Sequence, residues 1–570
     1  MQPYKMMYYL KGFRDLAKGY WKSDQKLKAG GILAVVIAMN LASVFLTVLI
    51  NNWYKEFWDV LQSYQFDSFW PLVGKFSLIA FLYISLGVYS VYLQQMLQIK
   101  WRQWMTERYL EDWMHGRVYY KLKLSGNDMD NPDQRISEDI NQFVTLTLTL
   151  SIGLMRQLIS LIAFVVILWN LSGIVTVPIG SYEFTIYGYM VWISLIYSIA
   201  GTYLTNKVGR KLIGLNYDQQ RFEADFRFSM MRVRENSESI AFYRGEQPEV
   251  AGFKERFLRV VANFRGIMTR QKLLNAFTVG YAQLAIIIPL LLAAPRWFAM
   301  EVQVGWIMQL SNAFGQVQTA MSYFVDSYAN IAQWCSVIRR LYGFDEHIKE
   351  SAKLHSGMQL SEADDAALHD VDIFLPDGTA LVKDCSLDMK DKHSLLIMGP
   401  SGIGKSTILR TMAGIWPYAK GSAVLPPASQ RLFLPQKPYL PLGSLRRSIF
   451  YPLMEDKSKD EELKRILHLC GIEKFAARLD DIDDWSRILS LGEQQRLAFA
   501  RILLYKPRFV FLDEATSALD EQLESDMYDL LSRCLPQTKV ISVGHRSTLL
   551  KKHEYKLSLV SAEKWSLMKI

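Results

Sequence analysis

Long runs without a charged side chain set the pattern of the first 325 residues. An α-helix needs about 20 apolar residues to cross the hydrocarbon core of a membrane, and several runs are long enough. They cover residues 29–54, 76–99, 157–182, 184–206, 273–295 and 302–325. A buried helix of a soluble protein explains one such run but not six, because side chains that face lipid exclude charge. The pattern predicts an α-helical transmembrane domain with six spans over residues 29–342.

Basic residues predict how these spans are oriented. Eight Lys or Arg fall within residues 100–156 and fourteen within residues 207–272, whereas residues 171–182 contain none. Cytoplasmic loops carry the excess of basic residues, so we expect the N-terminus, both long loops and the C-terminal half in the cytoplasm. Residues 1–28 carry seven more basic residues among aromatic ones, which predicts an amphipathic helix on the membrane surface.

The last of the six runs has a polar face. Its polar residues recur at alternating steps of three and four, which places them on one side of a helix. They are Gln309, Asn312, Gln316, Thr319, Tyr323, Asp326 and Asn330. Such a stripe is costly in lipid, so it faces either a water-filled translocation path or a neighbouring helix. The path is the first hypothesis because the stripe ends in the ionisable Asp326.

A polar stretch separates the spans from the rest of the chain. Residues 343–370 are rich in Asp, Glu, Ala, Ser and His and predict a linker. Two short apolar segments, residues 371–375 and 380–389, follow with a Pro-Asp-Gly turn between them. They predict two strands at the start of a soluble domain over residues 371–570.

Composition agrees with a membrane part joined to a soluble part, since half of the residues are hydrophobic and 21% are still charged. The cytoplasmic loops account for much of the net charge of +9, so nucleic acid is not expected as a partner. The four cysteines are far apart, which predicts thiols in a reducing compartment.

A glycine-rich stretch carries the first chemistry. Residues 399–407 match the pattern G-x-x-x-x-G-K-[ST] between a strand-length apolar run, residues 394–398, and a helical pattern from residue 408. Backbone N–H groups of such a loop cradle a polyphosphate, while Lys405 reaches the terminal phosphates and the Ser406 hydroxyl binds Mg²⁺. The predicted nucleotide-binding residues of the loop are Gly399, Pro400, Ser401, Gly402, Ile403, Gly404, Lys405, Ser406 and Thr407.

A second predicted strand delivers two carboxylates. Arg508 is followed by Phe-Val-Phe-Leu and then by Asp513 and Glu514. Asp513 is placed to hold Mg²⁺, and Glu514 to polarise an attacking water.

Further motifs follow in a fixed order: Leu-Ser-Leu-Gly-Glu-Gln-Gln-Arg at residues 489–496, Ser-Ala-Leu-Asp at 517–520 and Gly-His-Arg at 544–546. With the phosphate loop they resemble the ATP-binding cassette of ABC transporters over residues 371–560. The resemblance implies ATP and Mg²⁺ as cofactors and an α/β P-loop fold for the soluble domain.

The same resemblance implies a role for single residues. Gln436 contacts Mg²⁺ and the attacking water, and Ser490 and Gly492 close on the γ-phosphate of ATP. Asp520 corresponds to the D-loop aspartate and His545 to the switch histidine. The implied catalytic residues are Lys405, Gln436, Glu514 and His545, and the implied metal ligands are Ser406, Gln436 and Asp513.

The signature motif departs from the common Leu-Ser-Gly-Gly-Gln, with Leu491 and Glu493 in place of Gly and Gln. Which residue stacks on adenine, Phe374 or Leu375, stays open. The variant signature, with residues 131–136 and 234–246, resembles the group of peroxisomal fatty-acyl half-transporters, SbmA/BacA-like peptide permeases and a bacterial vitamin B12 transporter. Both segments fall in predicted cytoplasmic loops, where they can press on the ATPase domain.

ABC proteins place the phosphate loop of one cassette against the signature of another, so the resemblance implies a homodimer. We expect an ATP-driven half-transporter of a bacterial inner membrane that moves a peptide, a cobalamin-like compound or an acyl compound. Import and export are both open. The alternatives are a proton-coupled or facilitative permease whose cassette only regulates, and an exporter of a lipidic substrate; the six spans disfavour a soluble ABC protein that acts on DNA or ribosomes.

Overall fold

The structure is a computed structural model that describes residues 3–124, 131–179, 182–354 and 357–570. The chain divides into two compact units, residues 1–112 with 130–346 and residues 113–129 with 347–570. The first unit is mainly helical, and the second holds the larger β-sheets.

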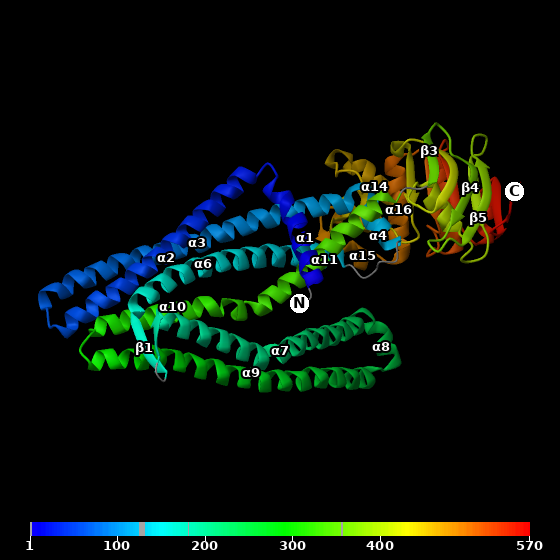
Figure 1. The fold of residues 1–570 in the computed structure, drawn as a ribbon. Helices are drawn as coiled ribbons and strands as arrows, with labels where there is room; N and C mark the ends of the chain where they lie inside the picture. Colours follow the sequence, from blue (N-terminus) through cyan, green and yellow to red (C-terminus); the bar gives the residue numbers. More distant parts are fainter. Residues whose placement is uncertain (1–2, 125–130, 180–181, 355–356) are drawn as a thin grey trace. The chain divides into compact units, whose positions relative to one another are not determined.

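In the described part of the chain, long helices occupy the predicted spans. They are α2 (Lys26–Gln62), α3 (Phe66–Met114), α6 (Ile140–Ser172), α7 (Tyr189–Glu235), α9 (Glu246–Phe298) and α10 (Val304–Asp326). In Figure 1, α7 runs along α9, and α10 packs against α6 and α2. Among the described residues, four helical stretches are long and apolar enough to cross a membrane, and they contain α2, α3, α6 and α9. The number of six spans and their boundaries therefore stay a prediction.

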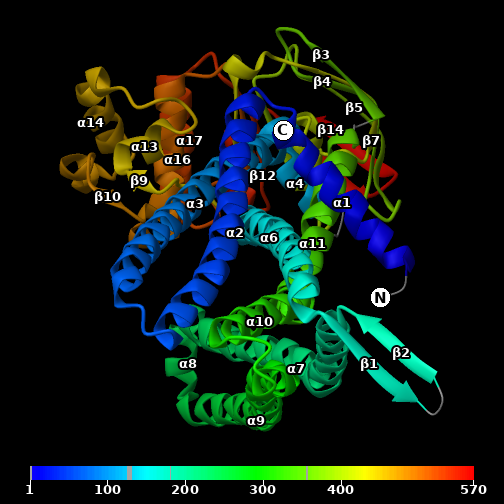
Figure 2. The same ribbon diagram turned by 60° about the vertical axis from the view of Figure 1, so that its left-hand side comes forward.

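The third and fourth predicted spans are wrong where they meet. α6 stops at Ser172, and Gly173, with a φ of 67°, ends the helix. β1 (Ile174–Ile179) and β2 (Tyr182–Tyr187) then pair as an antiparallel hairpin before α7 begins. Figure 2 shows this hairpin extending away from the helices. Residues 180–181 lie outside the described part. This segment is rich in uncharged β-branched residues, and a lack of charge does not distinguish a strand from a helix.

The N-terminal helix α1 (Pro3–Trp21) packs against protein. Its Tyr20 is fully buried and stacks on Trp101 of α3, with 5.4 Å between ring centroids. Phe13 lies 5.3 Å from Trp334 of α11 (Tyr328–Lys353) by the same measure. The apolar face of α1 thus has protein partners, where the sequence predicted a helix that rests on the membrane. Contact of its basic side with lipid stays a prediction.

A buried carboxylate ties the start of α6 to α11. Asp139, which is 1% exposed, accepts hydrogen bonds from Arg135 Nη1 at 2.7 Å, from Arg340 Nε at 2.8 Å and from Arg340 Nη2 at 2.5 Å. A short π-helical turn, Arg135–Asp139, follows α5 (Pro132–Gln134) and has these two residues at its ends. The segment at residues 131–136 therefore belongs to the first unit and supplies one arginine of this cluster. The segment at residues 234–246, with α8 (Ser237–Tyr243), also lies in the first unit.

The second unit is built on a six-stranded sheet in the order β14-β13-β6-β12-β11-β8. Every neighbouring pair is parallel except β13 with β14. The strands are β6 (Ser394–Met398), β8 (Arg431–Leu434), β11 (Phe509–Asp513), β12 (Lys539–Val543), β13 (Tyr555–Ser561) and β14 (Lys564–Lys569). Parallel neighbours place their carboxyl ends on one edge, so the loops after β6, β11 and β12 come together.

The second unit also holds a four-stranded sheet in the order β3-β7-β4-β5, and β9 (Gly443–Ser444) pairs with β10 (Ile482–Asp483). The strands of the four-stranded sheet are β3 (Gly357–Glu362), β4 (Ala367–Phe374), β5 (Ala380–Asp388) and β7 (Ala419–Leu425). The predicted strands at 371–375 and 380–389 are confirmed as parts of β4 and β5.

The predicted linker at residues 343–370 is wrong. Its first part continues α11 to Lys353, and its second part forms β3 and the start of β4, while residues 355–356 lie outside the described part. Only one of the six residues of β3 is buried, so the strand tolerates the polar composition of a connector. It nevertheless pairs in register with β7.

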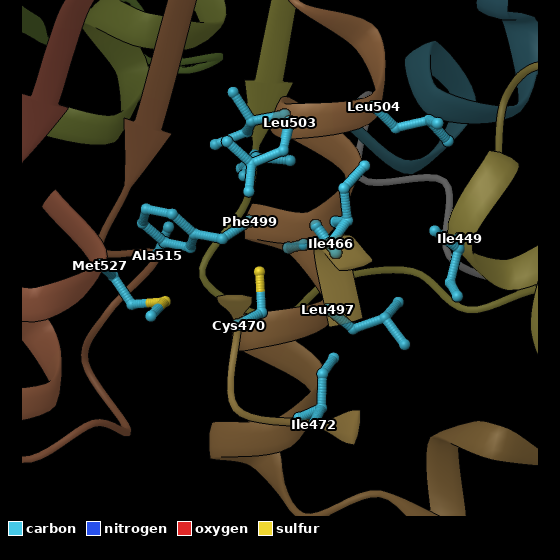
Figure 3. Close-up of a cluster of buried hydrophobic side chains, with 14 of the residues drawn as sticks. Ile449, Ile466, Cys470, Ile472, Leu497, Phe499, Leu503, Leu504, Ala515 and Met527 are labelled. Carbon is cyan, nitrogen blue, oxygen red and sulfur yellow. The ribbon is translucent and has the colours of Figure 1, made fainter. Parts of the chain in front are cut away.

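The second unit also contains several helices. They are α12 (Lys405–Met412), α13 (Leu445–Phe450), α14 (Asp460–Leu469), α15 (Trp485–Ile488), α16 (Leu491–Tyr505) and α17 (Glu521–Cys534). Figure 3 shows Ile449, Ile466, Leu497, Phe499 and Met527 of four of these helices in one buried cluster. The helix α4 (Val118–Leu124) belongs to this unit as well, and its Leu124 packs against the core around β6.

A buried histidine makes the stability of this unit depend on pH. His553 Nδ1 lies 2.8 Å from the Leu549 carbonyl oxygen, and Nε2 lies 2.9 Å from Ser542 Oγ. Burial lowers the pKa of His553 from 6.5 to about 4. Between these two pKa values the unfolded chain binds more protons than the folded chain. The contribution of His553 to the free energy of unfolding is therefore complete above pH 6.5 and is lost as the pH falls through 4.

We expect the free energy of unfolding to fall by about 3 kcal/mol from this group between pH 6.5 and pH 4. Thermal unfolding of the full chain in detergent at a series of pH values measures it. The variant His553→Gln should show a flatter profile, because glutamine keeps hydrogen-bonding groups but does not titrate. Parallel profiles for the two proteins contradict this assignment.

Candidate functional site

The predicted phosphate loop lies between β6 and α12, at the edge where the parallel strands end. Gly404 has a φ of 102°, a conformation that glycine adopts without strain. A Cβ on Gly399 would lie 2.6 Å from the carbonyl oxygen of Leu559, so a larger residue does not fit there. Lys405 Nζ donates to the carbonyl oxygens of Gly399 and Pro400, each at 2.9 Å. The lysine thus sits inside the curve of the loop, as phosphate binding requires.

The end of β11 brings the first carboxylate to this loop. Ser406 Oγ donates to Asp513 Oδ1 at 2.6 Å, although the two residues lie 107 positions apart. A hydroxyl and a carboxylate oxygen side by side are the donors that Mg²⁺ prefers. These two residues therefore fit a magnesium site next to a bound polyphosphate.

The second carboxylate meets the predicted Q-loop glutamine. Gln436 Nε2 donates to Glu514 Oε2 at 3.0 Å. Glu514 has a φ of 48°, and its backbone N–H donates to the Val543 carbonyl oxygen at 3.1 Å. A left-handed backbone at a non-glycine residue costs about 1–3 kcal/mol, and the bond to β12 helps to hold it. The strained turn directs Glu514 away from β11 toward Gln436.

The switch histidine and the D-loop aspartate lie at the same edge. His545 follows β12 and lines a small hollow together with Glu514 and Ser517. Asp520 caps α17, since its Oδ1 accepts the backbone N–H of Leu523 at 2.8 Å. The structure therefore brings His545 and Glu514 together as predicted, whereas Asp520 is engaged with its own helix.

The signature residues begin α16. The Ser490 hydroxyl accepts the backbone N–H of Glu493 at 3.3 Å, and Glu493 Oε2 accepts the backbone N–H of Ser490 at 2.8 Å, which forms a capping box. Burial raises the pKa of Glu493, but hydrogen bonds from Lys474 and Ser490 outweigh it and hold that pKa below its usual value. The carboxylate at this variant position thus has a structural partner in Lys474, at 2.6 Å.

Two residues inside the predicted motifs, for which no role was predicted, connect segments of the site. Gln495 is fully buried, and its Nε2 donates to the Gln436 carbonyl oxygen at 3.0 Å and to Ser517 Oγ at 3.2 Å. Arg546 donates to the carbonyl oxygens of Leu519 at 2.7 Å and Ser517 at 3.2 Å. They join the signature helix, the Q-loop and the switch segment to the D-loop. Their place inside motifs was the available signal.

The predicted translocation stripe on α10 divides into two kinds of residue. Gln309 donates to the Asn52 side chain of α2 at 2.9 Å, and the Tyr323 hydroxyl donates to a backbone carbonyl of α6 at 3.0 Å. These two make the contacts between helices that the sequence left open as the alternative. Thr319 and Asp326 are exposed, while Asn312 and Gln316 are half-buried. A path along the stripe stays a prediction for these four.

Comparison with known proteins identifies the family. The family model for ABC transporter transmembrane region 2 matches residues 16–298, and the ABC transporter model matches residues 382–517. An ABC transporter ATP-binding protein of Haemophilus influenzae is 37% identical over 98% of this chain and 93% of its own length. The chain belongs to the ABC transporters.

Further relatives place this ABC transporter more closely. The inner membrane ABC transporter ATP-binding protein YddA of Escherichia coli is 33% identical over 93% of this chain and 94% of its own. The human lysosomal cobalamin transporter ABCD4 is 28% identical over 96% and 94%. The chloroplastic ABC transporter D family member 2 of Arabidopsis thaliana is 34% identical over 97% of this chain and 86% of its own. The chain is thus a half-transporter of the D family, a multi-pass membrane protein whose cassette couples ATP hydrolysis to transport.

The fold is that of an exporter-type ABC transporter. The structure of a bacterial Atm1-family ABC exporter with ATP bound gives a TM-score of 0.71 at 17% identity and covers 94% of this chain and 95% of that one. The predicted fold class, a helical transmembrane domain followed by an α/β nucleotide-binding domain, is confirmed.

Proposed function

We propose that two copies of this chain form an ATP-driven transporter that moves a hydrophilic or amphipathic solute across a bacterial inner membrane. One observation supports the dimer. Residues on the edge of the six-stranded sheet form the phosphate side of a site, whereas the Ser490 hydroxyl bonds to its own helix. Within the described residues, no hydrogen bond joins the signature to the phosphate loop, so we infer that a second signature completes each site.

In this proposal each residue has a defined task. Lys405 and the loop N–H groups hold the phosphates of ATP, and Ser406 and Asp513 hold Mg²⁺, which neutralises charge on the phosphates. Glu514 accepts the proton of the attacking water, and Gln436, at 3.0 Å from it, keeps the carboxylate in place. His545, in the loop after β12, contacts the γ-phosphate. Ser490 and Gly492 of the second copy close the site.

The solute classes follow from the relatives and from the polar residues of α10. One relative is a cobalamin transporter and another is an inner-membrane protein, so a cobalamin-like compound and a bacterial inner membrane enter the proposal. Peptides and acyl compounds stay in the proposal because the sequence resemblance implies them, and the exposed Thr319 and Asp326 of α10 suit a polar part of the solute. The N-terminus and the cassette face the cytoplasm, as the basic loops indicate.

Transport by the full chain in proteoliposomes tests the proposal. Peptides, cobalamin and acyl-CoA are screened as cargo with ATP, with a non-hydrolysable analogue and with a protonophore. We expect transport that requires hydrolysis and withstands the protonophore. Transport that continues with the analogue and stops with the protonophore contradicts it and supports a permease that the cassette only regulates.

A further inference from the structure

A pocket of about 450 Å³ lies in the first unit, where α7, α9 and the junction of α10 with α11 meet. Ligand pockets of soluble and membrane proteins fall in this size range. The side chains that line it are of three kinds: apolar, neutral polar and charged. They include Leu212 and Leu274, Asn206 and Thr278, and Arg210 and Asp326.

The pocket lies at one boundary of the membrane. Arg210 is 21 residues after the start of α7 at Tyr189, and Asp326 is 22 residues after the start of α10 at Val304. At a rise of 1.5 Å per residue both lie about 32 Å along their helices, close to the thickness of the hydrocarbon core. Both helices start at the end that carries the hairpin and the α9–α10 turn. With the proposed orientation, the pocket opens near the cytoplasmic surface.

The two charged residues of the pocket do not neutralise each other. Among the described residues, neither Arg210 nor Asp326 forms an ion pair within 4.0 Å, and both side chains are exposed. A charge next to apolar walls is stabilised by a group of opposite sign. A ligand that supplies both signs and an apolar part therefore fits the lining better than an ion of one sign or a neutral lipid.

We propose that this pocket binds an amphipathic zwitterion, with its ammonium group at Asp326 and its anionic group at Arg210. The anionic group is a carboxylate in a short peptide or a phosphate in the headgroup of phosphatidylethanolamine. The apolar part of the ligand lies against Leu212 and Leu274. This inference rests on the proposed transport function, because it names the chemical class of the solute that the transporter takes up at its cytoplasmic end.

Binding without nucleotide tests this site. The full chain is reconstituted in nanodiscs of phosphatidylglycerol, which offer no zwitterionic lipid. The probe is a tritiated tetrapeptide of leucine and phenylalanine with free termini, together with its N-acetylated and C-amidated forms. We expect saturable binding of the free peptide, about tenfold weaker after Arg210→Gln and about tenfold weaker after Asp326→Asn.

The blocked peptides make the test specific. Arg210→Gln should leave the affinity for the C-amidated peptide unchanged, and Asp326→Asn should do so for the N-acetylated peptide, because the partner charge is already absent. Lys207→Gln, an exposed cation one turn earlier on α7, is the matched control and should bind like the parent. Monodisperse elution and retained ATP binding show that each variant is folded.

A second arm separates the two sources of the ligand. If the lipid headgroup is the better ligand, discs that contain phosphatidylethanolamine should weaken peptide binding to the parent but not to Arg210→Gln. If the peptide is the better ligand, these discs should leave peptide binding unchanged. Peptide binding that ignores both substitutions, or no binding of either zwitterion, overturns the proposal. ATP-driven transport does not enter this measurement, so the site and the proposed function fail separately.

Discussion

Replacing Glu514 by Gln leaves ATP binding intact and slows hydrolysis by about 10²–10⁴-fold. The amide has the size of the carboxylate and can still bond to Gln436, which lies 3.0 Å away, so the geometry of the site is kept. The amide does not accept a proton from the attacking water, and that step carries the loss. Binding of a fluorescent ATP analogue and release of inorganic phosphate measure the two quantities separately.

The control for this variant is Glu521→Gln. Glu521 is an exposed acidic residue at the start of α17, seven positions further along the chain, and we expect its variant to hydrolyse ATP like the parent. Hydrolysis by Glu514→Gln at the rate of the parent shows that another residue is the catalytic base. Loss of ATP binding in that variant shows instead a structural role for the carboxylate.

Replacing Asp139 by Ala destabilises the membrane unit by about 3–5 kcal/mol, the range for one partner removed from a buried ion pair. Asp139 accepts three hydrogen bonds from Arg135 and Arg340, and the Arg135 side chain is 9% exposed. Without the carboxylate, the guanidinium of Arg340 loses two hydrogen bonds, that of Arg135 loses one, and the start of α6 loses its tie to α11. Thermal unfolding in detergent, followed by intrinsic tryptophan fluorescence, measures the change.

Asp133→Ala is the matched control, since this exposed carboxylate lies six residues earlier in the same segment. We expect its melting temperature to stay within about one degree of the parent, as for most surface substitutions. A melting temperature for Asp139→Ala that equals that of the control shows that the arginines find water or other partners. The cluster then does not stabilise the membrane unit.

The nucleotide site was predictable because each of its residues stands in a motif of fixed spacing. Lys405, Ser406, Asp513 and Glu514 follow strands, and parallel strands bring their ends to one edge, so the meeting of Ser406 with Asp513 follows from the order of motifs. Ser490 was predicted only as a signature residue, and the structure shows that it also caps α16.

The errors have physical causes of their own. Apart from Glu183, the hairpin after Gly173 lacks charge, as a span does, and hydropathy does not distinguish a helix from a strand in such a run. β3 is a polar strand that its pairing with β7 holds in place, so its composition resembles a linker. Asp139 is one of several acidic residues in a charged segment, and its burial follows from the packing of α6 against α11, which the sequence does not display.

A disulfide between two chains tests whether the dimer shares its ATP sites. One chain carries Ser401→Cys in the phosphate loop and the other Ser490→Cys in the signature, both at exposed positions, and both chains carry Cys534→Ser, which removes the exposed native thiol. The chains are co-expressed with Glu514→Gln and oxidised with and without ATP. We expect an ATP-dependent disulfide dimer when both cysteine chains are present and none with either chain alone. No such dimer, although both chains bind ATP, contradicts it.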